Sequence, residues 1–157
     1  MKISVQGVEV LVDDEDAHLL EREWFLTSGQ KKYVRRQERV DGKKTVVFLH
    51  RVIAGAGPAE IVDHVNCNPL DNRRANLRIV SATANSRNKL KMTTRPATSR
   101  FKGVAKNRGA WRAAIRTEAG LKYLGRFSDE VEAALAYDLA SLKYHGEFGR
   151  RNFLPLV

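Results

Sequence analysis

The chain has few of the residues on which several classes of fold depend. Cys67 is its one cysteine in 157 residues, which excludes an internal disulfide and a zinc site built from several cysteines. No run of about 18 apolar residues occurs, so no membrane span is predicted. The N-terminus has no apolar signal core, so we expect a cytoplasmic protein that is not secreted.

Acidic residues are scarce after residue 30. Residues 1–30 contain two Lys/Arg and seven Asp/Glu, residues 31–90 contain thirteen and five, and residues 91–157 contain thirteen and six. The net charges of these segments are therefore −5, +8 and +7, within a total of +10. This distribution indicates a polyanionic partner, although charge alone fits a solvated basic surface equally well.

A small sheet is predicted before residue 50. Apolar residues alternate between residues 3 and 12, and β-prone runs at 32–38 and 45–49 flank Asp41-Gly42, a strong hairpin-turn signal. Residues 16–25 fit a short helix. These elements precede the segment in which the chemically active residue types gather.

Residues 61–90 predict the order strand, loop, strand, helix. The runs at 61–64 and 77–80 are β-prone, and Ser81 is suited to cap a helix over 82–90. The loop between the strands is polar and rich in turn-forming residues. The same window holds an adjacent acid and histidine followed by two asparagines: Asp63, His64, Asn76 and Asn85.

These four side chains are the set that phosphodiester hydrolysis with one divalent metal requires. Asp63 offers a hard oxygen ligand, and neutral His64 can take a proton from water. Adjacent residues on a strand point to opposite faces, so the two have separate roles. The amide of Asn76 can bond across the loop and hold His64, and Asn85 can supply a second oxygen ligand from the helix.

The segment from Leu49-His50-Arg51 to Asn88 resembles the HNH nucleases, and most closely the phage and intron-encoded homing endonucleases. The resemblance implies a ββα-metal fold, with Asp63 and Asn85 as ligands of Mg²⁺ (or Mn²⁺), His64 as general base and Asn76 as the structural residue. A bacterial or phage-infected cell is the implied setting. Cys67 stands where that branch has glycine, so a positive φ there would strain the loop.

Other residues of this segment allow more than one interpretation. Zinc binding by Cys67 and His64 lacks further ligands of suitable spacing. His50 is either structural or catalytic, with the structural role favoured. Arg51 can reach the scissile phosphate or form a surface salt bridge, and a second layer around the metal is the role favoured for Asn88.

Residues 100–153 predict three strands and a helix. The strands are expected at 100–105, 111–117 and 122–127, and Ser128 is the expected cap of a helix that ends at Gly146. Apolar residues recur along this helix at three-to-four spacing, and its alanines would allow close approach to the sheet. The spaced apolar residues are Val131, Ala134, Leu135, Leu139 and Leu142.

This part of the chain resembles the Apetala-two/ethylene-response DNA-binding domain of plant transcription factors. The matching motifs are Phe101-Lys102-Gly103-Val104, Trp111–Arg116, Leu124–Phe127, Glu132–Ala134, Ala136–Asp138 and Asn152-Phe153. The family's sheet enters the major groove, so the resemblance implies DNA-contacting roles for Lys102 and Arg116 and a structural role for Trp111. Ala105 and Tyr123 replace an arginine and a tryptophan, so base preference does not carry over.

The sequence therefore predicts an α+β protein with an N-terminal HNH nuclease domain (1–90), a linker (91–99) and a DNA-binding domain (100–153). We expect a metal-dependent endonuclease of double-stranded DNA, nicking or homing, acting as a monomer or weak dimer. The alternatives are a DNA-binding regulator with an inactive nuclease remnant, and RNA binding. The expected DNA-binding residues are Arg51, Arg73, Arg74, Arg87, Lys102, Lys106, Arg108, Arg112, Arg116 and Lys122.

Overall fold

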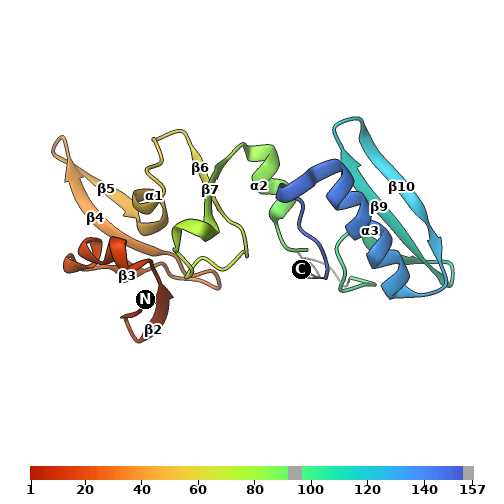
Figure 1. Cartoon of the computed structure of the whole chain (residues 1–157), viewed down its shortest axis with the longest axis horizontal. Coiled ribbons are helices and arrows are strands. Elements are labelled where there is room, and N and C mark those ends of the chain that lie inside the picture. The colour runs from red at the N-terminus through yellow and green to blue at the C-terminus, as the bar shows by residue number, and fades with distance from the viewer. Residues whose placement is uncertain (92–96, 154–157) are drawn as a thin grey trace. The chain divides into compact units, whose positions relative to one another are not determined.

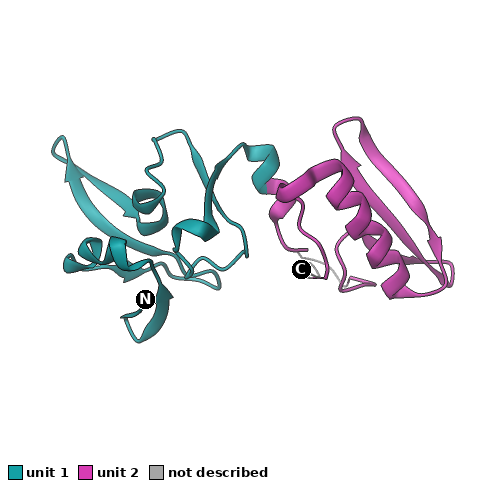
Figure 2. Ribbon diagram, viewed as in Figure 1, with its two compact units in different colours: residues 1–85 teal, residues 86–157 magenta. Residues whose placement is uncertain are grey.

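The computed structural model describes residues 1–91 and 97–153 and confirms the α+β class (Figure 1). The chain divides into two compact units, Met1–Asn85 and Ser86–Val157 (Figure 2). The predicted linker, 91–99, includes residues 92–96, which lie outside the described residues. The domain limits inferred from the sequence stay predictions. Within the described residues, no helix has the length and apolarity that a membrane crossing requires.

The first unit begins with two antiparallel sheets. Strands β1 (Lys2–Val5) and β2 (Val8–Leu11) form a hairpin. Strands β3 (Phe25–Leu26), β4 (Val34–Val40) and β5 (Lys43–Phe48) form a three-stranded sheet with β4 in the middle. The β4–β5 turn has positive φ at Asp41 and Gly42, as the Asp-Gly signal predicts.

The predicted helix over 16–25 is wrong in type and limits. The structure has a 3-10 helix, η1 (Asp14–Glu21), and residue 25 already belongs to β3. Acidic side chains dominate the start of this segment and bind elsewhere in the unit, so tertiary contacts outweigh helical spacing. The side chain of Trp24 closes the segment by donating to the carbonyl of Leu19 at 2.8 Å.

The ββα order expected for residues 61–90 is present. Strand β6 (Ile61–His64) pairs antiparallel with β7 (Leu77–Val80), and α2 (Ala82–Asn88) follows β7. The one-turn helix η2 (Arg74–Asn76) lies in the loop, directly before β7. Ser81 is the helix cap, since its Oγ accepts from the backbone N–H of Ala84 at 3.1 Å. A short helix, α1 (Leu49–Ile53), lies between β5 and β6 in the sequence.

The core of the first unit is built from residues of its N-terminal hairpin, its three-stranded sheet and α1. Val10, Val12, Val34 and Leu49 are at most 1 % exposed. They cluster with Val5, Trp24 and Ile53, so the N-terminal hairpin packs against the sheet and α1. Burial of such aliphatic side chains contributes about 1.5–3 kcal/mol each. This core holds the scaffold on which β6, β7 and their loop are mounted.

The second unit is a three-stranded sheet covered by one helix. Strands β8 (Val104–Asn107), β9 (Ala110–Thr117) and β10 (Gly120–Phe127) are antiparallel, with β9 central. Helix α3 (Glu130–His145) packs on one sheet face and is followed by η3 (Gly146–Phe148). The first strand starts later than predicted, because residues 99–103 form a turn.

The side of α3 that faces the sheet differs from the spaced leucine pattern. Ala133, Ala134, Tyr137 and Ala140 are buried against β8, β9 and their neighbours. The larger members of the pattern, Val131, Leu135, Leu139 and Leu142, are instead exposed, Leu139 at 72 %. Alanines allow the helix to approach the sheet closely, and that packing outweighs the larger side chains of the opposite face.

The N-cap of α3 is Asp129, one residue after the predicted Ser128. Its carboxylate accepts from the backbone N–H groups of Val131 at 2.7 Å and Glu132 at 3.1 Å. An ionised cap also interacts favourably with the helix dipole, an advantage that serine lacks. The end of α3 at His145, before Gly146, is as predicted.

Hydrogen bonds join residues 152 and 153 of the second unit to α3. The carboxylate of Asp138 accepts from the backbone N–H groups of Asn152 at 2.8 Å and Phe153 at 2.9 Å. The Asn152 amide oxygen then accepts from the N–H of Lys102 at 2.6 Å. The Ala136–Asp138 and Asn152-Phe153 motifs of the sequence therefore meet in space and support the fold.

Candidate active site and nucleic-acid interface

Asp63 and His64 lie at the end of β6, where the loop begins. Both are buried, with 7 % and 6 % exposure. Asp63 stands opposite Arg78 across the β6–β7 ladder, and His64 stands opposite Leu77. Successive side chains of the strand point to different faces, so the two groups have different neighbours, as the sequence predicts.

The carboxylate of Asp63 is held by Arg78. The guanidinium donates to Asp63 Oδ2 from Nε at 3.1 Å and from Nη2 at 2.9 Å. This partner of Asp63 was not predicted from the sequence. The signal that could have found this pair is the antiparallel register that β6 and β7 require, which places residues 63 and 78 opposite one another.

The imidazole of His64 sits in an aromatic cluster. Its ring centroid lies 5.1 Å from that of His50 and 6.2 Å from that of Tyr33. Burial lowers the pKa of His64, while the polar side chain of Asn72 and the charges of Asp63 and Asp71 oppose that shift. A lowered pKa keeps the ring neutral at physiological pH, the form that accepts a proton.

His50 is a second buried imidazole beside the first. Burial lowers its pKa to about 4, and the neighbouring charges of His64 and Arg51 act in the same direction. The ring also contacts Tyr33 and Phe48, at centroid distances of 5.7 and 5.6 Å. These contacts fit the structural interpretation of His50: a neutral wall against which His64 packs.

Asn76 bonds across the loop, as its position in the sequence suggests. Its Oδ1 accepts from the backbone N–H of Asn66 at 3.0 Å, and its Nδ2 donates to the carbonyl of Asp71 at 2.7 Å. The backbone of Val65 also donates to the Asn76 carbonyl at 2.9 Å. The side chain is buried, so these bonds fix the loop immediately after His64.

Asp71 is a further organiser of the loop that sequence reasoning did not single out. Its carboxylate accepts from Arg73 Nε at 2.8 Å and Nη2 at 2.7 Å, and from Asn66 Nδ2 at 2.8 Å. Hydrogen bonding from Arg73 lowers the pKa of Asp71, against the effect of burial. The Asp-Asn-Arg run is therefore a hydrogen-bonded unit rather than a set of free surface groups.

The loop is fastened to the N-terminal hairpin. The N–H of Leu11 donates to the carbonyl of Leu70 and the N–H of Asn72 donates to the carbonyl of Leu11, both at 2.8 Å. Beyond them, the N–H of Arg74 donates to Asp13 at 2.7 Å, and its guanidinium donates to Asp16 at 2.6 and 3.0 Å. Residues about sixty positions apart in the sequence thus hold the loop.

Cys67 has a positive φ, at a position where the homing endonucleases that this segment resembles have glycine. Its φ is 63°, and its N–H donates to the carbonyl of His64 at 2.8 Å in the turn that opens the loop. A non-glycine residue in this left-handed conformation is strained by about 1 kcal/mol. The departure from glycine therefore stores strain next to the candidate base.

The donor chemistry of Asp63 and Asn85 suits a hard divalent cation. One carboxylate and one amide oxygen match the ligands of Mg²⁺ or Mn²⁺ rather than those of zinc. Asn85 is half-buried in α2, and its side chain has no hydrogen bond to any described residue. It is thus available as a ligand. The three acids Asp13, Glu15 and Asp16, which lie close to one another, are instead bound by Arg74 through hydrogen bonds and ion pairs.

The arginines of the first unit that were expected to bind DNA have internal partners. Arg51 donates to the carbonyls of Glu60 and Gly57 at 2.6 and 2.5 Å, which differs from both interpretations of that residue. Arg73 and Arg74 pair with Asp71 and Asp16. These pairs use part of each guanidinium and leave contact with phosphate a prediction.

The sheet of the second unit has a face opposite to α3, defined here as the open face. By register, Ala105, Arg112, Ala114, Arg116, Leu121 and Tyr123 lie on it. Ala113 and Ile115 point to the helix instead and are buried. Arginines among small side chains, with exposed Tyr123, form a surface that a nucleic acid groove can approach.

The remaining basic residues predicted for this interface lie elsewhere. Lys106 and Lys122 point to the helix side, over the rings of Trp111 and Tyr144. Lys102 donates to the carbonyls of Arg87 and Lys89 at 2.6 and 2.7 Å. Arg108 lies in the β8–β9 turn, and Arg87 pairs with Glu118 at 3.0 Å.

Lys91 is a structural residue that sequence reasoning missed. Its ammonium donates to the carbonyls of Ser99, Phe101 and Val104 at 2.8–3.0 Å. Burial lowers its pKa. Lys91 thereby ties the start of the second unit to the turn before β8, although the sequence assigns it to a linker.

Comparison with known families matches the two parts of the chain to different proteins. Residues 47–87 match the model of an HNH endonuclease family. This range is well under half of the chain, but it contains Asp63, His64, Asn76 and Asn85. The HNH resemblance stated from the sequence is confirmed at the level of the family.

The curated relatives are plant proteins of the AP2/ERF type. An AP2/ERF and B3 domain-containing protein of Oryza sativa subsp. japonica is 42 % identical over 69 residues, 40 % of this chain and 19 % of the relative. AP2-like ethylene-responsive transcription factor PLT2 of Arabidopsis thaliana is 46 % identical over 59 residues, 35 % and 10 % of the two chains. A second Oryza AP2/ERF and B3 protein is 39 % identical over 82 residues, 52 % and 23 %.

The chain spans at most about a quarter of the length of these relatives. No solved structure matches it. The chain therefore combines an HNH endonuclease-like segment with similarity to AP2/ERF-domain proteins, and confirms the fusion that the sequence motifs indicate.

Proposed function

We propose that this protein is a metal-dependent DNA endonuclease of the HNH type, guided by an AP2-type DNA-binding domain. The observation that carries the proposal is the position of Asp63 and His64 at the end of β6, in a β6–β7–α2 frame whose loop is pinned by Asn76. The family match over residues 47–87 supports the same chemistry.

His64 is the general base of the proposed reaction. The neutral imidazole takes a proton from water, and the resulting hydroxide attacks phosphorus in line with the leaving 3′ oxygen. His50 and Tyr33 restrict the imidazole by ring contacts, and Asn76 fixes the loop behind it. The products are a 5′-phosphate and a 3′-hydroxyl.

Asp63 and Asn85 are the residues that would hold the cation, most simply Mg²⁺. When bound, a divalent ion supplies Lewis-acid stabilisation of the charge that develops on phosphate. Arg78 orients the Asp63 carboxylate through two donors to Oδ2. Such orientation of a ligand by a neighbouring side chain is common at metal sites.

The open face of the second unit is the proposed DNA reader. The register places Arg112 and Arg116 there, and the relatives of this chain include an AP2-like ethylene-responsive transcription factor. Sheets of this kind read DNA by placing side chains in the major groove. One active site per chain favours nicking, and two copies would cut both strands, as homing requires.

A plasmid nicking assay tests the nuclease proposal. Supercoiled DNA is incubated with the full chain in Mg²⁺, Mn²⁺ or EDTA, and we expect nicking with either metal and none in EDTA. Loss of a general base typically lowers the rate by about 10²- to 10⁴-fold, so His64→Ala should nick at that reduced rate. Equal rates for His64→Ala and the parent would overturn the role of His64.

The second candidate is a DNA-binding regulator with an inactive nuclease remnant. The Arg78–Asp63 ion pair favours it, since an arginine on a metal ligand competes with the cation for the same oxygen. The nicking assay separates the two candidates directly. Duplex binding without nicking in any metal would favour the regulator.

A further inference from the structure

The β4–β5 hairpin presents a basic face that lies outside the predicted DNA-binding residues. Directly opposite residues of an antiparallel pair share a face, and the faces alternate along each strand. Arg35 stands opposite Phe48, Gln37 opposite Val46, and Arg39 opposite Lys44. We define the hairpin face as these six residues, none of which is acidic.

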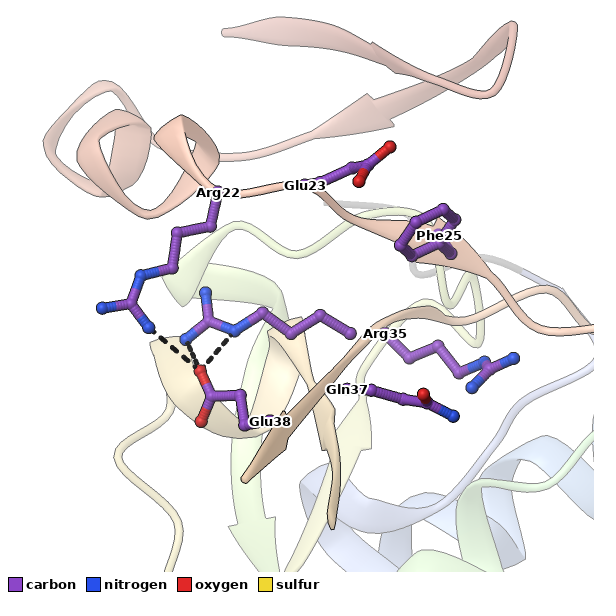
Figure 3. Close-up of a pocket in the computed structure, with 7 residues that line it drawn as sticks. Arg22, Glu23, Phe25, Arg35, Gln37 and Glu38 are labelled. Carbon is purple, nitrogen blue, oxygen red and sulfur yellow. Dashed lines mark hydrogen bonds and ion pairs between the residues drawn. The ribbon is translucent and has the colours of Figure 1, made fainter. Parts of the chain in front are cut away.

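The two faces of β4 have different partners. Arg35 and Gln37 extend to one side of the strand, and Glu38 extends to the other, toward Arg22 (Figure 3). On that second side Arg36 pairs with Glu38 and stacks over the ring of Trp24, 4.5 Å from its centroid. Arg36 on the second side is therefore occupied by contacts within the unit.

The cations of the hairpin face are not used in this way. Across residues 1–91 and 97–153, the side chains of Arg35, Arg39 and Lys44 form no ion pair or hydrogen bond. Residues 31–51 as a whole contain eight Lys/Arg and two Asp/Glu. A face with several unneutralised cations and no carboxylate attracts a polyanion.

One end of the hairpin face lies close to the candidate base, His64. Phe48, at its end, contacts the ring of His50 at 5.6 Å, and His50 contacts the ring of His64 at 5.1 Å. Lys31, just before β4, is close enough to His64 for its charge to act on the imidazole. A polyanion lying along this face would therefore continue toward His64.

The shape of the hairpin fits duplex DNA. Strand β3 pairs with β4 only as far as Arg35, so beyond that point β4 and β5 form a two-stranded ribbon. A major groove about 12 Å wide admits such a ribbon. At about 3.3 Å per residue, Arg35 and Arg39 are about 13 Å apart, enough to reach separate phosphates. Beside them a hollow of about 470 Å³ opens where β3 begins, and its lining includes Phe25 and Arg35 together with the carboxylates of Glu23 and Glu38.

We propose that the hairpin face is a second DNA-binding surface, which binds the duplex next to the phosphodiester bond whose attacking water His64 deprotonates. The proposal rests on the proposed nuclease function for the identity of the polyanion. It gives the first unit its own hold on DNA, separate from the open face of the second unit. The free Arg35, Arg39 and Lys44 would contact phosphates, and Gln37 would lie between them.

Binding of the full chain to a mixed-sequence DNA duplex in EDTA tests this surface. Affinity is measured by fluorescence anisotropy across a salt series, with Lys44→Ala compared with Lys43→Ala. These lysines are neighbours on β5, both exposed, and their strand partners Arg39 and Val40 place them on opposite faces. Each lost phosphate contact should reduce the magnitude of the log K–log[salt] slope by about 0.9. We expect this reduction for Lys44→Ala and an unchanged slope for Lys43→Ala.

The triple variant Arg35→Ala/Arg39→Ala/Lys44→Ala enlarges the effect. The magnitude of its log K–log[salt] slope should decrease by about 2.7, and its circular dichroism spectrum should be unchanged. Equal slopes for Lys43→Ala and Lys44→Ala, or a triple variant that loses affinity for single-stranded RNA but not for duplex DNA, would overturn the proposal. Because EDTA prevents cleavage, the measurement stands apart from the nicking assay, and either proposal can fail alone.

Discussion

At the scale of single residues, the site depends on side chains held in unusual states. His50 and His64 are buried imidazoles whose pKa values are lowered, and Cys67 has a left-handed backbone. Each of these features lies within the turn that begins at His64 or in ring contact with it. The local environment of the candidate base is therefore set by burial and strain rather than by exposed charge.

Replacement of Cys67 by glycine should stabilise the protein. Glycine adopts the φ of 63° without strain, so Cys67→Gly should raise the free energy of unfolding by about 1 kcal/mol. Urea denaturation followed by tryptophan fluorescence measures the change. Asp41→Gly is the matched control, because Asp41 has a φ of 50° but aspartate tolerates it better, so a smaller gain is expected. A destabilised Cys67→Gly would contradict the argument.

The sequence predicted the local arrangement of the candidate site better than the partners of its side chains. The adjacency of Asp63 and His64 and the position of Asn76 are local patterns, and they sufficed to expect separate faces and a bond across the loop. The Arg78–Asp63 pair and the Asp71 network depend on strand register and on the path of the loop. Neither can be obtained from spacing alone.

At the scale of elements, close packing rather than hydrophobic spacing decides the orientation of α3. The strands and the helix were predicted to within a few residues, yet the leucines that recur at three-to-four spacing along α3 are exposed. The sheet residues that pack with the alanines of α3 include the large side chains of Trp111, Ile115 and Phe127, and Gly103 lies against the ring of Tyr137. The choice between an alanine side and a leucine side depends on the shape of the sheet, which a helical period does not contain.

Gly103 should be intolerant of any side chain. A Cβ there would lie 1.9 Å from the ring of Tyr137 and 2.8 Å from the carbonyl oxygen of Ala114, at a φ of +76°. Gly103→Ala should therefore destabilise the protein by about 2–4 kcal/mol, from overpacking and backbone strain together. Thermal or urea unfolding provides the measurement.

Gly109→Ala separates the two contributions. Gly109 has a similar φ of +79°, but a Cβ there would meet nothing within 4 Å. Backbone strain alone predicts a loss of about 1 kcal/mol. If both variants lost the same stability, contact with Tyr137 would not be the reason that Gly103 is required.

At the scale of the whole molecule, the candidate active site and the open face belong to different units. If the open face holds DNA, Arg112→Ala/Arg116→Ala should raise KM for plasmid nicking about tenfold or more, with little change in kcat. Lys106→Ala/Lys122→Ala removes the same charge from the helix side and should change KM less. A drop in kcat with constant KM for the arginine pair would place those residues nearer the chemistry than the fold suggests.

The hydrogen bonds that join the loop between β6 and β7 to the N-terminal segment have a consequence for the order of folding. The bonds from Arg74 to Asp13 and Asp16 join residues 61 and 58 positions apart. Contacts of such long sequence separation form late, after the entropy of closing the intervening chain has been overcome. As the chain leaves the ribosome, the site would assemble only once residue 74 can return to the first strands, so partly made chains would lack a competent loop.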